Sequence, residues 1–153
     1  MAGQPGPGTV NNVLVFDVTG MEIREQNPVA GALQEPQFII PVTSDFVADV
    51  SFEISGLLAN TVTCIAMPPP PYEVSVHAES IGVGQEGEIG SATGNLVCGQ
   101  LDYTQSVTIP AGTLDIGVYK LVAVVKFTGT TPPLPMIGFT DNPIMIQIKE
   151  RLW

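Results

Sequence analysis

Apolar and polar residues alternate with a period of two along much of the chain. Between Phe46 and Ile54 every even-numbered residue is apolar, while most odd-numbered residues are polar. Since successive side chains of a β-strand point to opposite faces, this pattern predicts a strand with one buried face. The same alternation recurs in three further segments: Tyr72 to Ala78, Leu101 to Ile109 and Ile144 to Ile148.

Two other segments, Val13 to Val18 and Val118 to Phe127, are more continuously apolar. This composition is typical of strands that are covered on both sides or that cross the centre of a sheet. No window has convincing helical spacing, and Thr61 to Met67 is interpreted as an extension of the preceding strand region. Turn-forming residues separate the segments: Gly20, Pro28, Gly31, Pro36, Gly56, the prolines at 68 to 71, the glycines between Gly82 and Gly99, Pro110 to Gly112, and Pro132 with Pro133.

Strands that follow one another without crossover helices favour antiparallel pairing. We therefore expect an all-β fold, an antiparallel two-sheet sandwich of about seven strands. At 153 residues, the chain has the length of one domain with one core. Residues 1–10, rich in Gly and Pro, are predicted to form a flexible leader, and residues 11–153 to form the domain.

The stretch "TIPAGTLDIGVYKLVAVVKF" places Leu114 five residues before Tyr119, with Gly117 between them. It resembles the corner between the fifth and sixth strands of immunoglobulin-like and fibronectin type III-like sandwiches. The resemblance implies that the Tyr119 hydroxyl returns to nearby backbone; the alternative is a half-buried core tyrosine without a corner. Antibody-type recognition is not implied, because Trp153 is terminal and the cysteines do not lie in the middles of the corresponding strands.

The two cysteines, Cys64 and Cys98, are 34 residues apart in the sequence and are expected to be buried thiols. A disulfide is the alternative, and it would place the protein outside the cytoplasm. The chain as given begins without a recognisable signal peptide, so a cytoplasmic location is expected, with export by a signal-independent route left open. Zinc is disfavoured because a structural site needs four ligands and the only other soft ligand is His77.

The charge is strongly negative: 15 acidic residues against 5 basic ones give a formal net charge of −10. Such a chain repels phosphate backbones and anionic lipid, so nucleic acid and membranes are excluded as expected partners. The one histidine, His77, shares its predicted strand face with Glu73 and Glu79. No nucleophile motif accompanies it, so an ordinary solvated histidine, no catalysis and no cofactor are predicted.

Calcium is the more serious chemical alternative, since carboxylates in loops at one end of a sandwich can surround a hard cation. The acids in or near predicted turns are Asp45, Asp49, Glu86, Glu88, Asp115 and Asp141. They do not have the spacing of a calcium loop, which favours a solvated acidic surface. The glycine-rich stretch from His77 to Gly99 is predicted to form irregular middle strands, or else a flap.

Four consecutive prolines, Pro68 to Pro71, precede one predicted strand. Such a run could dock in an aromatic groove of a partner, but prolines also end strands and block edge pairing. An inter-strand loop is the favoured interpretation.

We therefore expect a non-enzymatic structural or interaction module, an immunoglobulin-like subunit, adaptor or decoration domain of a larger assembly. Its partner would be another protein or a second copy of the chain, and a calcium-dependent or carbohydrate-binding sandwich is the alternative. Two apolar segments are the predicted contacts: the loop Thr130 to Phe139 and the C-terminal tail, which either docks on a neighbour or covers its own core. The named contact residues are Pro133, Leu134, Met136, Ile137, Arg151, Leu152 and Trp153.

Overall fold

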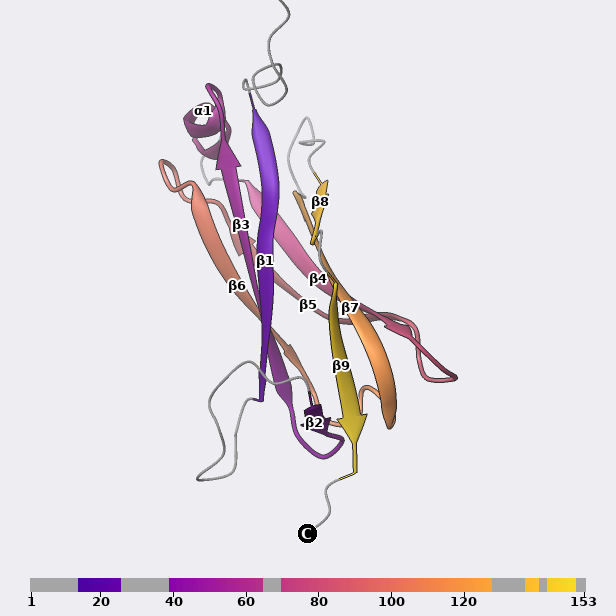
Figure 1. The fold of residues 1–153 in the computed structure, drawn as a ribbon. Helices are drawn as coiled ribbons and strands as arrows, with labels where there is room; N and C mark the ends of the chain where they lie inside the picture. Colours follow the sequence, from indigo (N-terminus) through magenta and orange to yellow (C-terminus); the bar gives the residue numbers. More distant parts are fainter. Residues whose placement is uncertain (1–13, 26–38, 65–69, 128–136, 141–142, 151–153) are drawn as a thin grey trace, which may run out of the picture.

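The computed structural model describes residues 14–25, 39–64, 70–127, 137–140 and 143–150. These residues form nine strands and one short helix (Figure 1). The elements are β1 (Val15–Glu25), β2 (Ile39–Pro41), β3 (Phe46–Ser55), α1 (Ala59–Thr63), β4 (Pro71–Ser80), β5 (Gly87–Asn95), β6 (Asp102–Ile109), β7 (Gly117–Phe127), β8 (Ile137–Phe139) and β9 (Ile144–Lys149).

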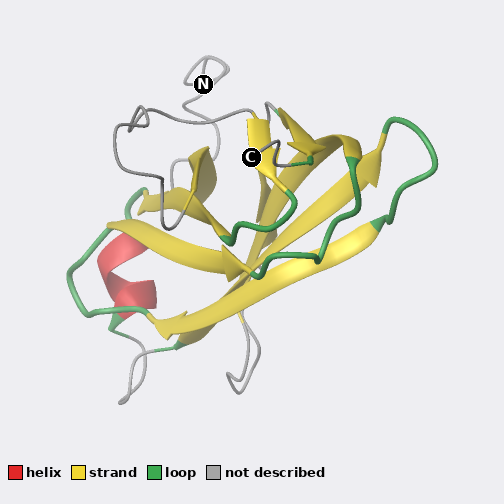
Figure 2. Cartoon of the chain, turned by 90° about the horizontal axis from the view of Figure 1, so that it is seen from below, coloured by secondary structure: helices red, strands yellow, loops and turns green. Residues whose placement is uncertain are grey.

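The strands build two sheets that pack face to face (Figure 2). One sheet has the order β1-β3-β6, and the other has the order β2-β9-β7-β4-β5, with β8 also paired to β7. The predicted all-β two-sheet sandwich is therefore confirmed. Two details differ: β2 and β8 have three residues each, too few to show a period, and β2 runs parallel to β9.

Strand β1 is longer than predicted, because Gly20 does not end it. The strand continues to Glu25, and its pairing with β3 shifts between Val18 and Gly20, which leaves Thr19 as an extra residue. A residue inserted on one strand of an antiparallel pair is a β-bulge, and a glycine inside a strand often marks one.

The predicted strand extension at Thr61 to Met67 is wrong for the described residues. Ala59 to Thr63 form the single turn of helix α1, whose Ala59, Val62 and Thr63 are buried. Residues 65–69 lie outside the described part of the chain. The period-two signal failed here because a segment this short has no periodicity of its own and is shaped by what it packs against.

An aromatic cluster fills the interior near the end of the sandwich that carries α1. Phe52 stacks on Tyr103 of the same sheet, with ring centroids 5.1 Å apart, and meets Tyr72 of the other sheet edge-on at 5.1 Å. Phe16 joins Phe52 to Phe127, again with edge-on rings. Each such pair adds about 0.5–1.5 kcal/mol beyond the burial of its area, so the cluster couples the two sheets tightly.

The corner predicted around Tyr119 is confirmed. Tyr119 is fully buried at the start of β7, and its hydroxyl donates to the backbone carbonyl of Asp115 at 2.9 Å. Leu114 is buried beside the corner. The side chain of Gln85 bridges the β4–β5 connection to Asp115, donating from Nε2 to Oδ2 at 2.7 Å and accepting from the Asp115 N–H at 3.0 Å.

Strands β8 and β9 together line one edge of β7, but with an interruption. Four residues lie between Phe139 and Ile144, whereas only two lie between their partners Val124 and Leu121. Thr140 spans the gap: its N–H donates to the Ala123 carbonyl at 3.1 Å, and its Oγ1 accepts from the Ala123 N–H at 3.2 Å. The side chain thus replaces a strand bond that the irregularity removes.

The glycine-rich stretch forms the irregular middle strands, as predicted, with a register shift between β4 and β5 at Val76 and His77. Two glycines of β5 allow β6 to lie close. A Cβ at Gly90 would lie 3.1 Å from Val107, and a Cβ at Gly94 would collide with the Tyr72 hydroxyl. Small residues therefore close this lateral side of the sandwich.

We predict that Gly94→Ala destabilises the fold by about 1–3 kcal/mol, because the added methyl displaces Tyr72 from its bond to Gln105. Chemical denaturation measures the loss. Gly82→Ala is the matched control, since a Cβ there meets nothing within 4 Å. Equal stability of the Gly94 variant and the wild type would contradict the close packing of the Tyr72 side chain over Gly94.

A second prediction concerns alkaline pH. Burial raises the pKa of Tyr72, Tyr103 and Tyr119, the only tyrosines of the chain. Because the folded state holds these protons more tightly, the associated stability is present below the unfolded pKa of about 10 and is lost as the pH rises through the folded values. Urea denaturation between about pH 8 and pH 11 should show the decline.

The variant Tyr119→Phe should cost about 1 kcal/mol at neutral pH, because the bond to Asp115 is lost, and should make the alkaline decline shallower. A decline as steep as that of the wild type would show that Tyr119 does not contribute to it.

Candidate interaction surface at the disulfide-linked end

Strand register brings several chain connections to one end of the sandwich, the upper end in Figure 1. The connections from β3 to β4 and from β5 to β6 both lie there, as does the point where β7 ends and β8 begins. The register pairs that place them are Val15 with Ser55, Glu53 with Asp102, Pro71 with Asn95, Tyr72 with Phe127, and Lys126 with Ile137.

A disulfide between Cys64 and Cys98 links two of these connections, with Cα atoms 4.6 Å apart. Both cysteines are exposed. The prediction of two buried thiols is therefore wrong. Helix α1 ends at Cys64, and the turn after β5 carries Cys98, so their meeting depends on the pairing of β4 with β5 and not on any local pattern.

Hydrogen bonds fix both connections to the sandwich. The Thr63 hydroxyl donates to the Asn60 carbonyl at 3.0 Å and accepts from the Gly99 N–H at 3.1 Å. The Tyr103 hydroxyl, part of the aromatic cluster, donates to the Gln100 carbonyl at 2.6 Å and accepts from the Val97 N–H at 3.1 Å. The loops are thus held by a covalent bond and by a rigid core residue.

Three large apolar side chains project from these fixed connections. Leu57 is 85% exposed, Leu58 is 44% exposed, and Val97, next to Cys98, is 53% exposed. Gly56, with φ of 101°, turns the chain out of β3 and into the two leucines. Exposed apolar groups on well-held loops are typical of a contact surface.

Most residues predicted as contacts lie outside the described residues. These are Pro133, Leu134, Met136, Arg151, Leu152 and Trp153; for Ile137 the structure describes its place in β8 but not its side chain. Nevertheless, the predicted contact residue Ile137 pairs with Lys126 near the end of β7 and so lies at the disulfide-linked end. Leu57, Leu58 and Val97 were not predicted; the only sequence signal was a pair of leucines directly after the turn-forming Gly56.

The proline run is divided between a connection and a strand. Pro71 is the first residue of β4, and Pro70 is buried, with its carbonyl accepting from the Leu96 N–H at 2.9 Å. The first position of a strand tolerates proline because its missing N–H is not needed there. Pro68 and Pro69 lie outside the described residues.

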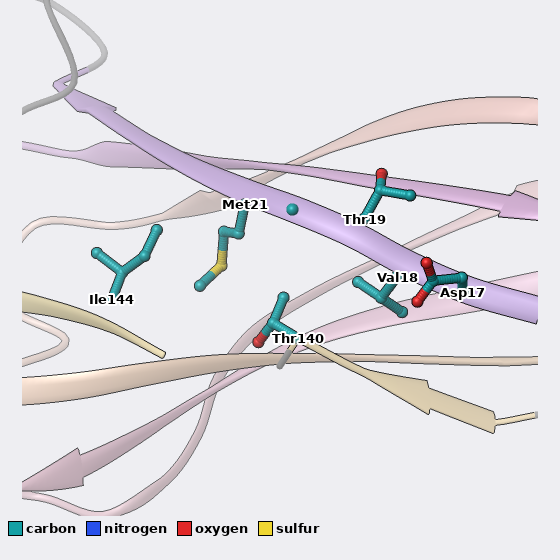
Figure 3. Close-up of a pocket in the computed structure, with 7 residues that line it drawn as sticks. Asp17, Val18, Thr19, Met21, Thr140 and Ile144 are labelled. Carbon is teal, nitrogen blue, oxygen red and sulfur yellow. The ribbon is translucent and has the colours of Figure 1, made fainter. Parts of the chain in front are cut away.

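A lateral opening of about 420 Å³ lies between β1 and the β8–β9 edge (Figure 3). It forms where the bulge of β1 faces the interruption at Thr140, and its lining includes Val18, Thr19, Met21 and Ile144. Among the described lining residues, Asp17 is the one with a charged side chain. The opening lies between two irregular edges that face each other, and the polar side chains among its described lining residues are Asp17, Thr19 and Thr140.

The histidine and the acidic residues serve structural roles where they are described. His77 Nε2 lies 3.0 Å from the Ser75 hydroxyl on the outer face of β4, while Glu73 forms an ion pair with Lys126 at 3.3 Å. The sequence predicted a solvated histidine, whereas the His77 side chain is half-buried. No group of three His, Cys, Asp or Glu side chains suited to a metal ion occurs among the described residues.

Three of the carboxylates considered for calcium binding, those of Asp45, Asp49 and Asp115, form hydrogen bonds within the protein. Asp45 accepts from the Ala111 N–H at 2.7 Å, and Asp115 is bonded to Gln85. Burial acts to raise the pKa of Asp49, but hydrogen bonds from Arg24 and Ser106 and the charge of Arg24 outweigh it, so that the pKa lies below its ordinary value. Asp141 lies outside the described residues.

The chain matches no protein-family model and no curated protein sequence. Within the described residues, the one helix is far too short to cross a bilayer.

We predict that reduction of the disulfide lowers the melting temperature. The cross-link closes a loop of 34 residues, and its loss should cost about 4 kcal/mol, or roughly 10 °C for a chain of this size. The double variant Cys64→Ser/Cys98→Ser should melt like the reduced protein and should not respond to reductant. An unchanged melting temperature after complete reduction, verified by thiol titration, would show that the cross-link is dispensable.

Proposed function

We propose that this protein is a non-enzymatic interaction module with an immunoglobulin-like sandwich, which presents its disulfide-linked end to a protein partner. The order β1-β3-β6 corresponds to the A-B-E order of immunoglobulin sheets, and β4-β7-β9 corresponds to C-F-G. The corner at Tyr119 falls at the start of β7, the strand that corresponds to F. These correspondences support the immunoglobulin-like assignment.

The observation that carries the proposal is the set of exposed Leu57, Leu58 and Val97 on connections joined by a disulfide. Their loops have few conformations to lose on binding, because Thr63 and Tyr103 already fix them. Preorganised apolar groups contribute more to affinity than mobile ones, since less ordering entropy opposes the contact. The predicted contact residue Ile137 has its place in β8 at the same end.

The partner is proposed to be a protein. A net charge of −10 opposes nucleic acid and anionic lipid, and exposed apolar side chains suit another protein surface better than a small polar ligand. The proposed role requires no cofactor.

We further propose that the protein works in an oxidising compartment. The expectation of a cytoplasmic location rested on the lack of a recognisable signal peptide in the chain as given, and a disulfide argues against it, because disulfides persist mainly where the surroundings are oxidising. Thiol trapping of the protein in its native cells, before any exposure to air, tests this: free Cys64 and Cys98 would argue for a reducing compartment.

The interaction role predicts site-selective cross-linking in the cells that produce the protein. A photoreactive residue placed at Leu57 or at Val97 should give a discrete protein adduct. The same residue at Glu22, exposed on β1 and remote from this end, is the matched control and should give none. Equal adducts at all three positions, or none at Leu57 and Val97, would count against the proposed surface.

A further inference from the structure

The outer faces of the two sheets differ in character. On the β1-β3-β6 sheet the outward residues are mostly acids and hydroxyls, and register places Asp17, Glu53 and Asp102 side by side across three strands. Among the described residues, none of the large apolar side chains classed as exposed lies on β1, β3 or β6. That face is built to stay in water, because like charges aligned across strands need solvent to screen them.

The other outer face carries an apolar band. Phe139 is 57% exposed and Met145 is 49% exposed, and both lie beside β7. Strand pairing sets Phe139 opposite Val124 and Met145 opposite Lys120, so these residues share the outer face with Val122. The intervening residues of β7 are fully buried on the other side.

Charge on this apolar face is balanced, although the chain as a whole is strongly acidic. On the strands of this face that the structure describes, the outward acids are Glu73, Glu79 and Glu88, and the outward lysines are Lys120, Lys126 and Lys149. Two copies of an acidic protein repel each other through most of their surface. They meet without that cost only where the surface is neutral, and this face meets that condition.

We propose that this face binds a second copy of the chain in an isologous dimer, with a twofold axis that lies midway between the two faces, parallel to them and perpendicular to the strands, and that passes over Val122 of each copy. The inference rests on the proposed interaction role but uses a different surface. Aligned sheets pack about 10 Å apart with strands within about 30° of each other, so residues at equal distances from the axis face one another to a first approximation.

Register then gives the contacts across the axis. Lys120 and Val124 lie at equal distances from Val122 and face each other between the copies, as do Lys126 and Val118. Because Met145 is level with Lys120 and Phe139 with Val124, the methionine of one copy faces the phenylalanine of the other.

Strand register also gives the residue that faces the acidic Glu79 across the axis. Glu79 is level with Lys120 and Ser75 is level with Val124, so Glu79 of one copy faces Ser75 of the other. On β7 and β4 this arrangement places none of the charged residues opposite a like charge. A second copy thus fits the face both in apolar contact and in charge.

Sedimentation velocity from about 1 µM to about 1 mM tests the dimer over the range where moderate affinities are measurable. Phe139→Ser and Met145→Ser should each raise the dissociation constant at least about tenfold, since each removes a central apolar contact. Leu57→Ser and Val83→Ser are matched controls, because both residues are more exposed but lie off the face; they should leave the constant unchanged. Thermal melts verify that every variant is folded.

A charge-sign test addresses the register. Val124→Lys would place a lysine opposite Lys120 of the second copy, whereas Val124→Glu would place an acid there. The glutamate variant should therefore dimerise at least about tenfold more tightly than the lysine variant. Overall charge alone predicts the reverse order, because the added lysine lowers the net repulsion.

Three results would overturn the proposal: a strictly monomeric wild type up to the highest concentration, a lysine variant that dimerises as well as or better than the glutamate variant, or a dimer weakened by Leu57→Ser but not by Phe139→Ser. The last would move self-association to the disulfide-linked end and would leave the proposed interaction role intact. If instead a photoreactive residue at Leu57 gave no protein adduct while the dimer persisted, the proposed interaction surface would be wrong and the dimer would stand.

Discussion

The contact of Phe52 with Tyr103 and Tyr72 is the interaction on which the rest of the molecule depends. It joins the two sheets at the end where the long connections attach, and Phe16 and Phe127 extend it to the neighbouring strands. Closely packed rings of this kind permit little relative movement of the sheets. The positions of the loops at that end therefore follow from the core.

Tyr103 shows how core packing and surface are connected. Its ring stacks in the interior, while its hydroxyl holds the backbone of Val97 and Gln100. The exposed Val97 and the disulfide at Cys98 are thus anchored by a side chain whose position the core determines. At the opposite end, Tyr119 does the same for the corner at Asp115.

The two lateral sides of the sandwich are closed in different ways. Gly90 and Gly94 let β5 and β6 approach closely, so one side is sealed by backbone. On the other side the bulge of β1 faces the interruption at Thr140, and the opening stays between them. Three kinds of surface result: a fixed loop end, an acidic sheet face and a neutral apolar sheet face. Of these described surfaces, the loop end and the apolar sheet face carry exposed apolar side chains of the kind found in protein–protein contacts.

The sequence by itself determined the long alternating strands and the class of fold, because alternation records directly which side of a strand is buried. It also located the corner at Tyr119, since Leu114, Gly117 and Tyr119 are local to one turn. Tertiary structure decided the pairing of Cys64 with Cys98, the placement of Leu57 and Val97 at the same end of the sandwich, and the balance of charge on the described strands of one outer face. Each of these depends on which distant strands become neighbours, and no local pattern carries that information. The bulge at Thr19 and the turn of α1 belong to the same class, because packing against the rest of the sandwich overrides the weak preferences of short segments.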